Sequence, residues 1–329
     1  MTLHRRTLFG ATAGCALASL SPREASAQTR WQMATAYPDA NFHTRNNRQF
    51  LDEVRAAIGV ETQMHTNGSL LPQAQIKRGV QQGQVQLGEI LLSAYGNEDV
   101  FFEVDSIPQL VLNTPSARRL HDLSLPFVEA RFARQGLTIL YMIPWPPSGL
   151  YTNVQVESIE TLRGTRMRTF NAVTNRFATL VGATPTLVQA AEVPQAFATG
   201  VVNAMVTSAQ TGVDSAAWDF ARIFTPIGFT RTRNAVFMQR RAFDALPAAQ
   251  QAAVRAAATA AETRGWAASD EATVTMQNTL AQRGMTVAQP TPALMEGLGR
   301  IGETMTQEWL ARAGEDGARV ITAYRAARS

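Results

Sequence analysis

Short apolar segments alternate with amphipathic ones along much of this chain, and their order restricts the folds it can adopt. Strand-like runs and helix-like segments come in the order 31–35, 42–58, 60–65, 72–82 and 85–92. Because a strand–helix–strand order joins parallel strands, the pattern predicts a layered α/β architecture. The alternation returns with further expected strands and helices at 137–143, 166–169, 172–182, 185–188, 193–199, 204–207 and 234–239.

The remainder of the chain favours long helices, at 247–283, 292–314 and 318–328. A long helix that follows two α/β units can brace both of them. We therefore expect two lobes. Lobe I is expected to comprise 28–149 plus about 236–280, and lobe II 150–235 plus about 281–329.

The first 27 residues have the features of an export signal. Arg5 and Arg6 precede a mildly apolar stretch, and Ala25-Ser26-Ala27 is a small-residue cleavage site. The paired arginines are typical of a twin-arginine signal, although a general secretory signal can also carry them. Cleavage after Ala27 removes Cys15, the single cysteine. We expect a periplasmic protein without disulfides.

Composition and motifs argue against several classes of function. Thirty Lys and Arg residues against 26 Asp and Glu give a net charge of +4, too small for a nucleic-acid groove, so no nucleic-acid partner is expected. Nucleophile-elbow, metalloprotease and phosphate-loop motifs are missing from the sequence. A G-x-G-x-x-G at 297–302 follows a helix start rather than a strand, which disfavours a dinucleotide site. We expect no enzyme, no catalytic residues, no metal and no cofactor.

Four carboxylates cluster at Glu98, Asp99, Glu103 and Asp105. Paired carboxylates can perform acid–base chemistry, but neither a histidine nor a nucleophile accompanies them in sequence. We interpret the cluster as a solvated loop.

Arg168 is the first candidate for a binding residue. It lies in a predicted strand after a turn at Gly164, and strand alternation places Met167 toward the core and Arg168 on the opposite side. Ligands bind near the carboxyl ends of strands in open α/β sheets, and an arginine there can hold a carboxylate with two hydrogen bonds. On spacing alone, a surface arginine remains the alternative.

An ordered set of segments carries a family resemblance. They are LRGTRMR at 162–168, GATP at 182–185, AEVPQAFATGVVNA at 191–204, NGSL at 67–70, QGQVQLG at 82–88, DSIP at 105–108 and AFDALP at 242–247. Together they resemble the solute-binding subunits of tripartite ATP-independent periplasmic (TRAP) transporters, the DctP family. The resemblance extends over essentially the whole chain after residue 27.

The resemblance implies a two-lobed periplasmic binding protein fold, with a long helix spanning both lobes, that closes over an organic acid. It also implies integral membrane subunits, driven by an ion gradient, as partners. The family's carboxylate-clamping arginine falls on Arg168, and a family glutamate falls on Glu192. The position of a ligand-contacting asparagine is Thr207 here. A second binding arginine has no counterpart at 148–150, which disfavours ligands with two basic contacts.

Aromatic and polar side chains are expected beside this arginine. Residues expected in or near the cleft are Trp145, Tyr151, Phe170, Trp218, Tyr37, Asn41, His43, Ser93 and Tyr95. As a group they favour an apolar or aromatic monocarboxylate, with a small 2-oxo or hydroxy acid as the close rival.

Other functions remain open at this stage. An ABC-type binding protein shares export and two lobes, although the ordered segments argue against it. A ligand-presenting subunit of a sensor system cannot be separated by sequence. A periplasmic enzyme would need catalytic groups that the motifs do not supply. We expect a monomer.

Overall fold

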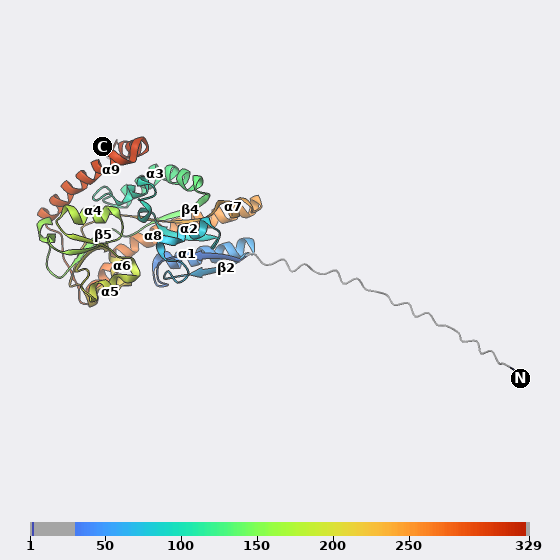
Figure 1. Ribbon diagram of the computed structural model, residues 1–329, viewed down its shortest axis with the longest axis horizontal. Helices are drawn as coiled ribbons and strands as arrows, with labels where there is room; N and C mark the ends of the chain where they lie inside the picture. Colours follow the sequence, from blue (N-terminus) through green and yellow to red (C-terminus); the bar gives the residue numbers. More distant parts are fainter. Residues whose placement is uncertain (1, 3–29, 327–329) are drawn as a thin grey trace.

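Two β-sheets organise the part of the chain that the structure describes, a computed structural model of residues 2 and 30–326. One sheet lies in each of two lobes, and helices cover both (Figure 1). We call the part built on the first sheet lobe I and the part built on the second sheet lobe II. The predicted export signal, 1–27, lies outside the described residues except for residue 2.

Lobe I is built on a five-stranded mixed sheet. Its strands lie in the order β2 (Glu61–His65), β1 (Arg30–Ala34), β3 (Leu87–Leu91), β10 (Arg233–Gln239) and β4 (Leu137–Pro144). β1 is parallel to both neighbours, as the alternation predicts, whereas β10 is antiparallel to β3 and β4. α1 (Phe42–Ile58) packs on one face, and α2 (Gln73–Gln81) and α3 (Thr114–Arg134) pack on the other.

Lobe II is built on a six-stranded mixed sheet. Its strands lie in the order β11 (Thr286–Val287), β9 (Ile223–Thr225), β5 (Ser148–Thr152), β8 (Ala204–Ser208), β6 (Arg166–Thr169) and β7 (Thr184–Leu187). β6 is parallel to β7 and β8, and β5 is antiparallel to β8 and β9. α4 (Ala172–Leu180) belongs to one hydrophobic core, and α5 (Val193–Ala198) and α6 (Ala209–Asp214) belong to another.

Two extended segments cross between the lobes side by side. Residues 145–147 join β4 to β5, and residues 226–232 join β9 to β10. The Trp145 amide donates to the Thr232 carbonyl at 2.7 Å, and the Ser148 amide donates to the Thr230 carbonyl at 3.0 Å. The lobes are therefore connected through a hydrogen-bonded pair of segments that joins β4 and β10 of the first sheet to β5 and β9 of the second.

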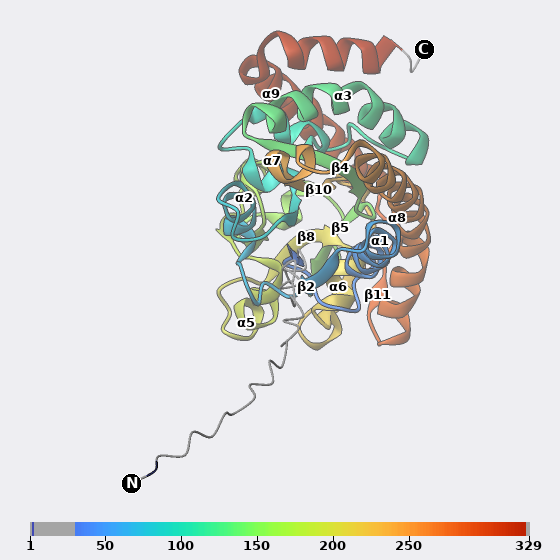
Figure 2. The ribbon, with the colours of Figure 1, turned by 90° about the vertical axis from the view of Figure 1, so that its right-hand side faces the viewer.

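Two long helices also connect the lobes. α8 (Ala248–Gln282) follows the short α7 (Arg240–Asp244) and places Val254 in a lobe I core and Leu280 in a lobe II core. Figure 2 shows α8 running from beside α1 and β4 to the neighbourhood of β11. The α/β fold with a long helix spanning both lobes is confirmed.

α9 (Pro292–Ala326) departs from the expected division. Its first turns pack in lobe II through Leu294, but Trp309 and Tyr324 are buried in the lobe I core. The assignment of 281–329 to lobe II therefore does not describe the end of the chain. Gly314, with a backbone φ of 65°, interrupts the helix where the sequence predicted its end.

Several elements were not anticipated from the sequence. α3 carries Pro126 inside it, which obscures the helical pattern. β5 begins directly after Pro146 and Pro147, so the segment resembled a turn. β9 and β11 span only three and two residues, too few to show any periodicity. β10 and β5 also begin slightly earlier than the expected lobe boundaries at 236 and 150.

The acidic cluster is not a solvated loop, because each carboxylate has its own basic partner. Glu103 and Asp105 are buried within the 3₁₀ segment Val100–Ser106, with 1% and 2% of their surfaces exposed. The ion pairs are Glu98–Lys77, Asp99–Arg131, Glu103–Arg312 and Asp105–Arg233. These carboxylates hold elements of lobe I and α9 together.

The Asp105–Arg233 pair gives a test of this role. Arg233 donates to Asp105 from its backbone amide at 3.0 Å and from Nε at 2.9 Å, and both side chains are buried. Asp105→Ala leaves the guanidinium without its carboxylate, so we expect a loss of about 3–5 kcal/mol of unfolding free energy. Urea denaturation measures it. Asp52→Ala, which removes an exposed ion pair on α1, should change stability by less than about 1 kcal/mol. Equal effects of the two substitutions would contradict this account.

Candidate functional site

Arg168 is a buried cation without an acidic partner in the described part of the chain. It occupies the third position of β6, and 3% of its surface is exposed, while Met167 beside it packs in the core as predicted. Its Nε donates to the Val188 carbonyl at 2.9 Å, and no ion pair joins it to a described carboxylate. Burial lowers the pKa of Arg168 to about 10, so the guanidinium stays protonated at neutral pH. Such a buried charge is unfavourable unless an anion compensates it.

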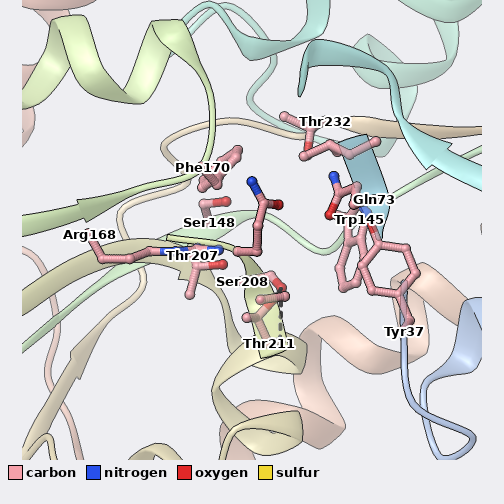
Figure 3. A pocket seen from close by; sticks show the side chains of 13 residues that line it. Tyr37, Gln73, Trp145, Ser148, Arg168, Phe170, Thr207, Ser208, Thr211 and Thr232 are labelled. Carbon is pink, nitrogen blue, oxygen red and sulfur yellow. Dashed lines mark hydrogen bonds between the residues drawn. The ribbon is translucent and has the colours of Figure 1, made fainter. Parts of the chain in front are cut away.

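The Arg168 side chain lines a cavity between the lobes. The space not occupied by atoms is about 450 Å³, part of it open to solvent. Figure 3 shows the guanidinium extending into the cavity from lobe II, with Tyr37 and Trp145 on the opposite side. Both lobes contribute to the lining residues, which are Tyr37, Gln73, Leu91, Trp145, Ser148, Arg168, Phe170, Gln189, Ala190, Thr207, Ser208, Thr211 and Thr232.

Hydroxyl groups surround the guanidinium. Ser148 on β5 pairs with Ser208 on the neighbouring β8, and Thr207 precedes Ser208. Ser208 also begins α6, where its Oγ accepts from the Thr211 amide at 3.2 Å. Hydroxyls at the ends of paired strands can donate to a carboxylate that Arg168 holds. The family-derived position Thr207 therefore lies in the cavity, where we predicted it.

Aromatic rings form the apolar part of the wall. Tyr37 and Trp145 meet edge to face with ring centroids 5.0 Å apart. The Phe170 ring lies beside the Arg168 guanidinium, 5.2 Å from Cζ to the ring centroid. One cation, several hydroxyls and three aromatic rings give the cavity a charged end and an apolar end.

A buried polar network lies behind the lobe I wall, between the sheet and α1. Asn234 Oδ1 accepts from Trp145 Nε1 at 2.8 Å and from the Tyr37 hydroxyl at 3.3 Å. Asn234 Nδ2 donates to Glu89 Oε1 at 3.0 Å, and Thr35 Oγ1 donates to Glu89 Oε2 at 2.5 Å. None of this network was predicted, although a glutamate inside the apolar β3 sequence was a signal that could have revealed it.

His43 packs beside this network rather than in the cavity, and neither of its ring nitrogens makes a hydrogen bond. It is fully buried, its ring centroid is 4.5 Å from that of Trp145, and its Nδ1 lies 3.5 Å from Glu89 Oε1. Burial lowers the pKa of His43 well below its usual value, so the imidazole is neutral. His43 supports the back of the aromatic wall and does not line the cavity.

Two sets of hydrogen bonds join the lobes around the cavity. Asn41 Nδ2 donates to Asp214 Oδ2 at 2.6 Å. Asn171 Nδ2 donates to Ser93 Oγ at 2.9 Å and to Ser106 Oγ at 3.3 Å. Asn41 and Ser93, both predicted to contact ligand, form these interlobe hydrogen bonds and are not among the residues that line the cavity around Arg168. In this structure the two lobes are thus in direct contact on either side of the cavity.

A second, wider space adjoins the cavity and shares Gln73, Phe170 and Gln189 with it. Ser93 and Tyr95 line this space rather than the cavity around Arg168. The Tyr95 hydroxyl donates to the Gln73 carbonyl at 2.7 Å. Tyr95 therefore faces the approach to the site.

Three predicted site residues lie elsewhere. Tyr151 is fully buried in a lobe II core, and its hydroxyl donates to the Ser208 carbonyl at 3.0 Å. Trp218 packs against the Arg283 guanidinium, 5.1 Å from Cζ to the ring centroid. Glu192 is exposed and accepts from the Gln189 amide at 3.2 Å, which caps a helical turn. None of the three lines the cavity around Arg168.

Neither a metal site nor a membrane-spanning helix is found among the described residues. No three His, Cys, Asp or Glu side chains among residues 2 and 30–326 gather as a metal site. None of the described helices is long and apolar enough to cross a membrane.

Glu89 gives a pH-dependent prediction. Burial raises its pKa from 4.5 to about 7, so between these values the folded state binds more protons than the unfolded state. The contribution of Glu89 to the unfolding free energy is therefore fully present below about pH 4.5 and is lost as the pH rises through 7. Relative to Glu89→Gln, the wild-type protein should lose on the order of 3 kcal/mol of unfolding free energy across this range, at about 1.4 kcal/mol per unit. Urea denaturation at a series of pH values measures it. Asp105 and Asp214 are present in both the wild-type protein and Glu89→Gln, so they affect both pH profiles alike. Parallel profiles of unfolding free energy against pH would therefore contradict the prediction.

Comparisons with known proteins agree with this architecture. Residues 45–311 match the model of the DctP family, described as bacterial extracellular solute-binding protein, family 7. DctP7 of Bordetella pertussis, an extracytoplasmic solute receptor that binds pyroglutamic acid, is 44% identical, with a TM-score of 0.88 over 90% of this chain and 99% of that one. DctP6 of the same organism, which also binds pyroglutamic acid, is 38% identical, with a TM-score of 0.89 over 91% and 100%.

A third similar structure comes from a marine metagenome, from an unidentified microbe. It is a TRAP solute-binding protein specific for pyroglutamate, 33% identical, with a TM-score of 0.88 over 91% of this chain and 99% of that one. All three are receptors rather than enzymes. The chain belongs to the DctP family, the solute-binding subunits of TRAP transporters.

Proposed function

We propose that this receptor captures a small ring-bearing monocarboxylate, with pyroglutamate as the first candidate. It acts outside the cytoplasm after removal of residues 1–27 and delivers the acid as a monomer to TRAP membrane subunits. The carboxylate binds at Arg168, and the ring lies against the aromatic wall.

The buried guanidinium of Arg168 is the observation that carries this proposal. Among the described residues that line the cavity, Arg168 is the charged one. Its Nε is already bound to the Val188 carbonyl, so the two terminal nitrogens are the donors directed at a ligand. A planar pair of donors matches the two oxygens of one carboxylate. A single clamp supports a monocarboxylate over a dicarboxylate.

The rest of the lining supports a small and partly polar ligand body. Ser148, Thr207 and Ser208 surround the charged end, and Trp145 and Phe170 supply apolar contact. A five-membered lactam offers a flat face for the rings and polar atoms for the hydroxyls. The similarity to three receptors of pyroglutamate supports the same ligand here. An aromatic or branched acid would use the rings but leave more of these hydroxyls without partners.

Closure of the lobes supplies the signal to the membrane partner. Tyr37 and Trp145 come from lobe I, and Arg168 comes from lobe II, so a bound acid touches both. A ligand shifts an open–closed equilibrium only through its higher affinity for the closed state. The Asn41–Asp214 hydrogen bond contributes to the same state.

Substitution of Arg168 tests the clamp. Arg168→Ala should weaken pyroglutamate binding at least about 100-fold, because the carboxylate is left desolvated without its ionic partner. Arg168→Lys keeps the charge but loses the planar fork, so we expect an intermediate affinity. Isothermal titration calorimetry measures both.

Arg166→Ala is the matched control. Arg166 lies two residues earlier on β6, is exposed and donates from Nε to the Gly200 carbonyl at 2.8 Å, outside the cavity lining. Loss of the Arg166 side chain should change the affinity for pyroglutamate little. Aromatic and branched monocarboxylates, hydroxy acids and dicarboxylates serve as comparison ligands. Unchanged affinity in Arg168→Ala, or binding confined to dicarboxylates, would refute the single clamp.

A further inference from the structure

The side-chain amide of Asn234 is held in one orientation from two sides. The Trp145 indole N–H can only donate, so Asn234 must present Oδ1 to it. Glu89 Oε1 accepts from Asn234 Nδ2 on the other side. A proton on Glu89 can lie on Oε2, toward Thr35, which leaves Oε1 an acceptor in either charge state. A flipped amide would put two donors against each other at Trp145.

This fixed amide determines the hydrogen-bonding role of Tyr37. The Tyr37 hydroxyl meets Asn234 Oδ1 at 3.3 Å and therefore donates its single hydrogen to it. The phenol oxygen keeps its lone pairs, and Tyr37 lines the cavity opposite Arg168. Burial raises the pKa of Tyr37 well above its usual value, so the hydroxyl remains protonated and remains this donor.

We propose that the Tyr37 oxygen is accessible from the cavity and accepts a hydrogen bond from the ligand, and that Asn234 and Glu89 are positioning residues that keep it an acceptor. The cavity then selects a carboxylate whose ring carries an N–H or O–H group on the lobe I side. This specificity rests on the proposed function, because it takes the cavity as the site of a ring-bearing acid.

The charges at the two ends of the site favour a ligand with its carboxylate toward Arg168 and its hydrogen-bond donor toward Tyr37. Arg168 lies at the lobe II end, and Glu89 is buried behind the lobe I wall, hydrogen-bonded to Asn234. A ligand with an anionic group toward Arg168 and a donor toward Tyr37 therefore aligns its dipole with the field of Arg168, and with that of Glu89 when this carboxyl group is ionised. A ligand without the donor leaves the phenol oxygen buried without a partner.

A matched pair of ligands tests the selection. One is pyroglutamate, and the other is its cyclopentanone analogue, in which a methylene group replaces the ring N–H and the shape is kept. We expect the wild-type protein to prefer pyroglutamate by about tenfold or more in calorimetric affinity, because a buried acceptor discriminates against the analogue that lacks the donor. Tyr37→Phe removes one oxygen atom, so pyroglutamate should lose this factor while affinity for the analogue stays within about twofold.

Two further variants separate positioning from general damage. Asn234→Leu releases the Tyr37 hydroxyl to donate, so the preference for pyroglutamate should fall even where total affinity also falls. Phe170→Leu reduces apolar contact and should weaken both ligands equally, leaving their ratio unchanged. If Asn234→Leu does not fold, Tyr37→Phe decides alone.

The outcomes distinguish the two proposals. Binding of pyroglutamate with a preference that Tyr37→Phe does not change would overturn the role of Tyr37 and leave the proposed function intact. Equal affinity of the wild-type protein for both ligands would do the same. Absence of pyroglutamate binding to the wild-type protein would overturn the proposed function and this specificity with it.

Discussion

A guanidinium buried without a carboxylate partner is the constraint around which the site is arranged. Arg168 is placed by the alternation of β6, held by the Val188 carbonyl and surrounded by hydroxyls from β5 and β8. Burying a cation in this way is unfavourable for the protein alone, and a bound anion removes the disadvantage. The same buried charge is therefore unfavourable for the protein without a ligand and favourable for the binding of an acid.

The two lobes are built so that they can respond to that interaction together. The hydrogen-bonded crossing segments connect the two sheets beside the cavity, to which they contribute Trp145 and Thr232, and α8 and α9 connect the lobes as well. The direct contacts across the cleft include the polar pairs Asn41 with Asp214 and Asn171 with Ser93, and the packing of Phe170 against the lobe I core. Polar contacts exchange readily with water when the lobes separate. Most of the apolar core residues lie within one lobe or along the long helices, and Phe170 is an exception that packs across the cleft.

The sequence predicted much of the fold and the centre of the site, but less of its surroundings. Strand alternation placed Arg168 correctly, and the βαβ order predicted the parallel strands around it. The pattern could not distinguish aromatic residues of the core from those of the cavity, since both are buried. Tyr151 packs in a lobe II core, while Trp145 lines the cavity. Carboxylates such as Asp105 resembled a loop because their basic partners are distant in sequence. Glu89 was missed because its neighbours are distant in sequence: Asn234 lies on β10, Thr35 follows β1 and His43 lies on α1.

The central claim is that a carboxylate bound by Arg168 occupies the cavity between the closed lobes. A crystal structure of the protein with pyroglutamate tests it most directly. The account predicts the ligand carboxylate within hydrogen-bonding distance of both terminal nitrogens of Arg168 and the ring between Trp145 and Phe170. Ligand density at any other place, or a carboxylate turned away from Arg168, would contradict it.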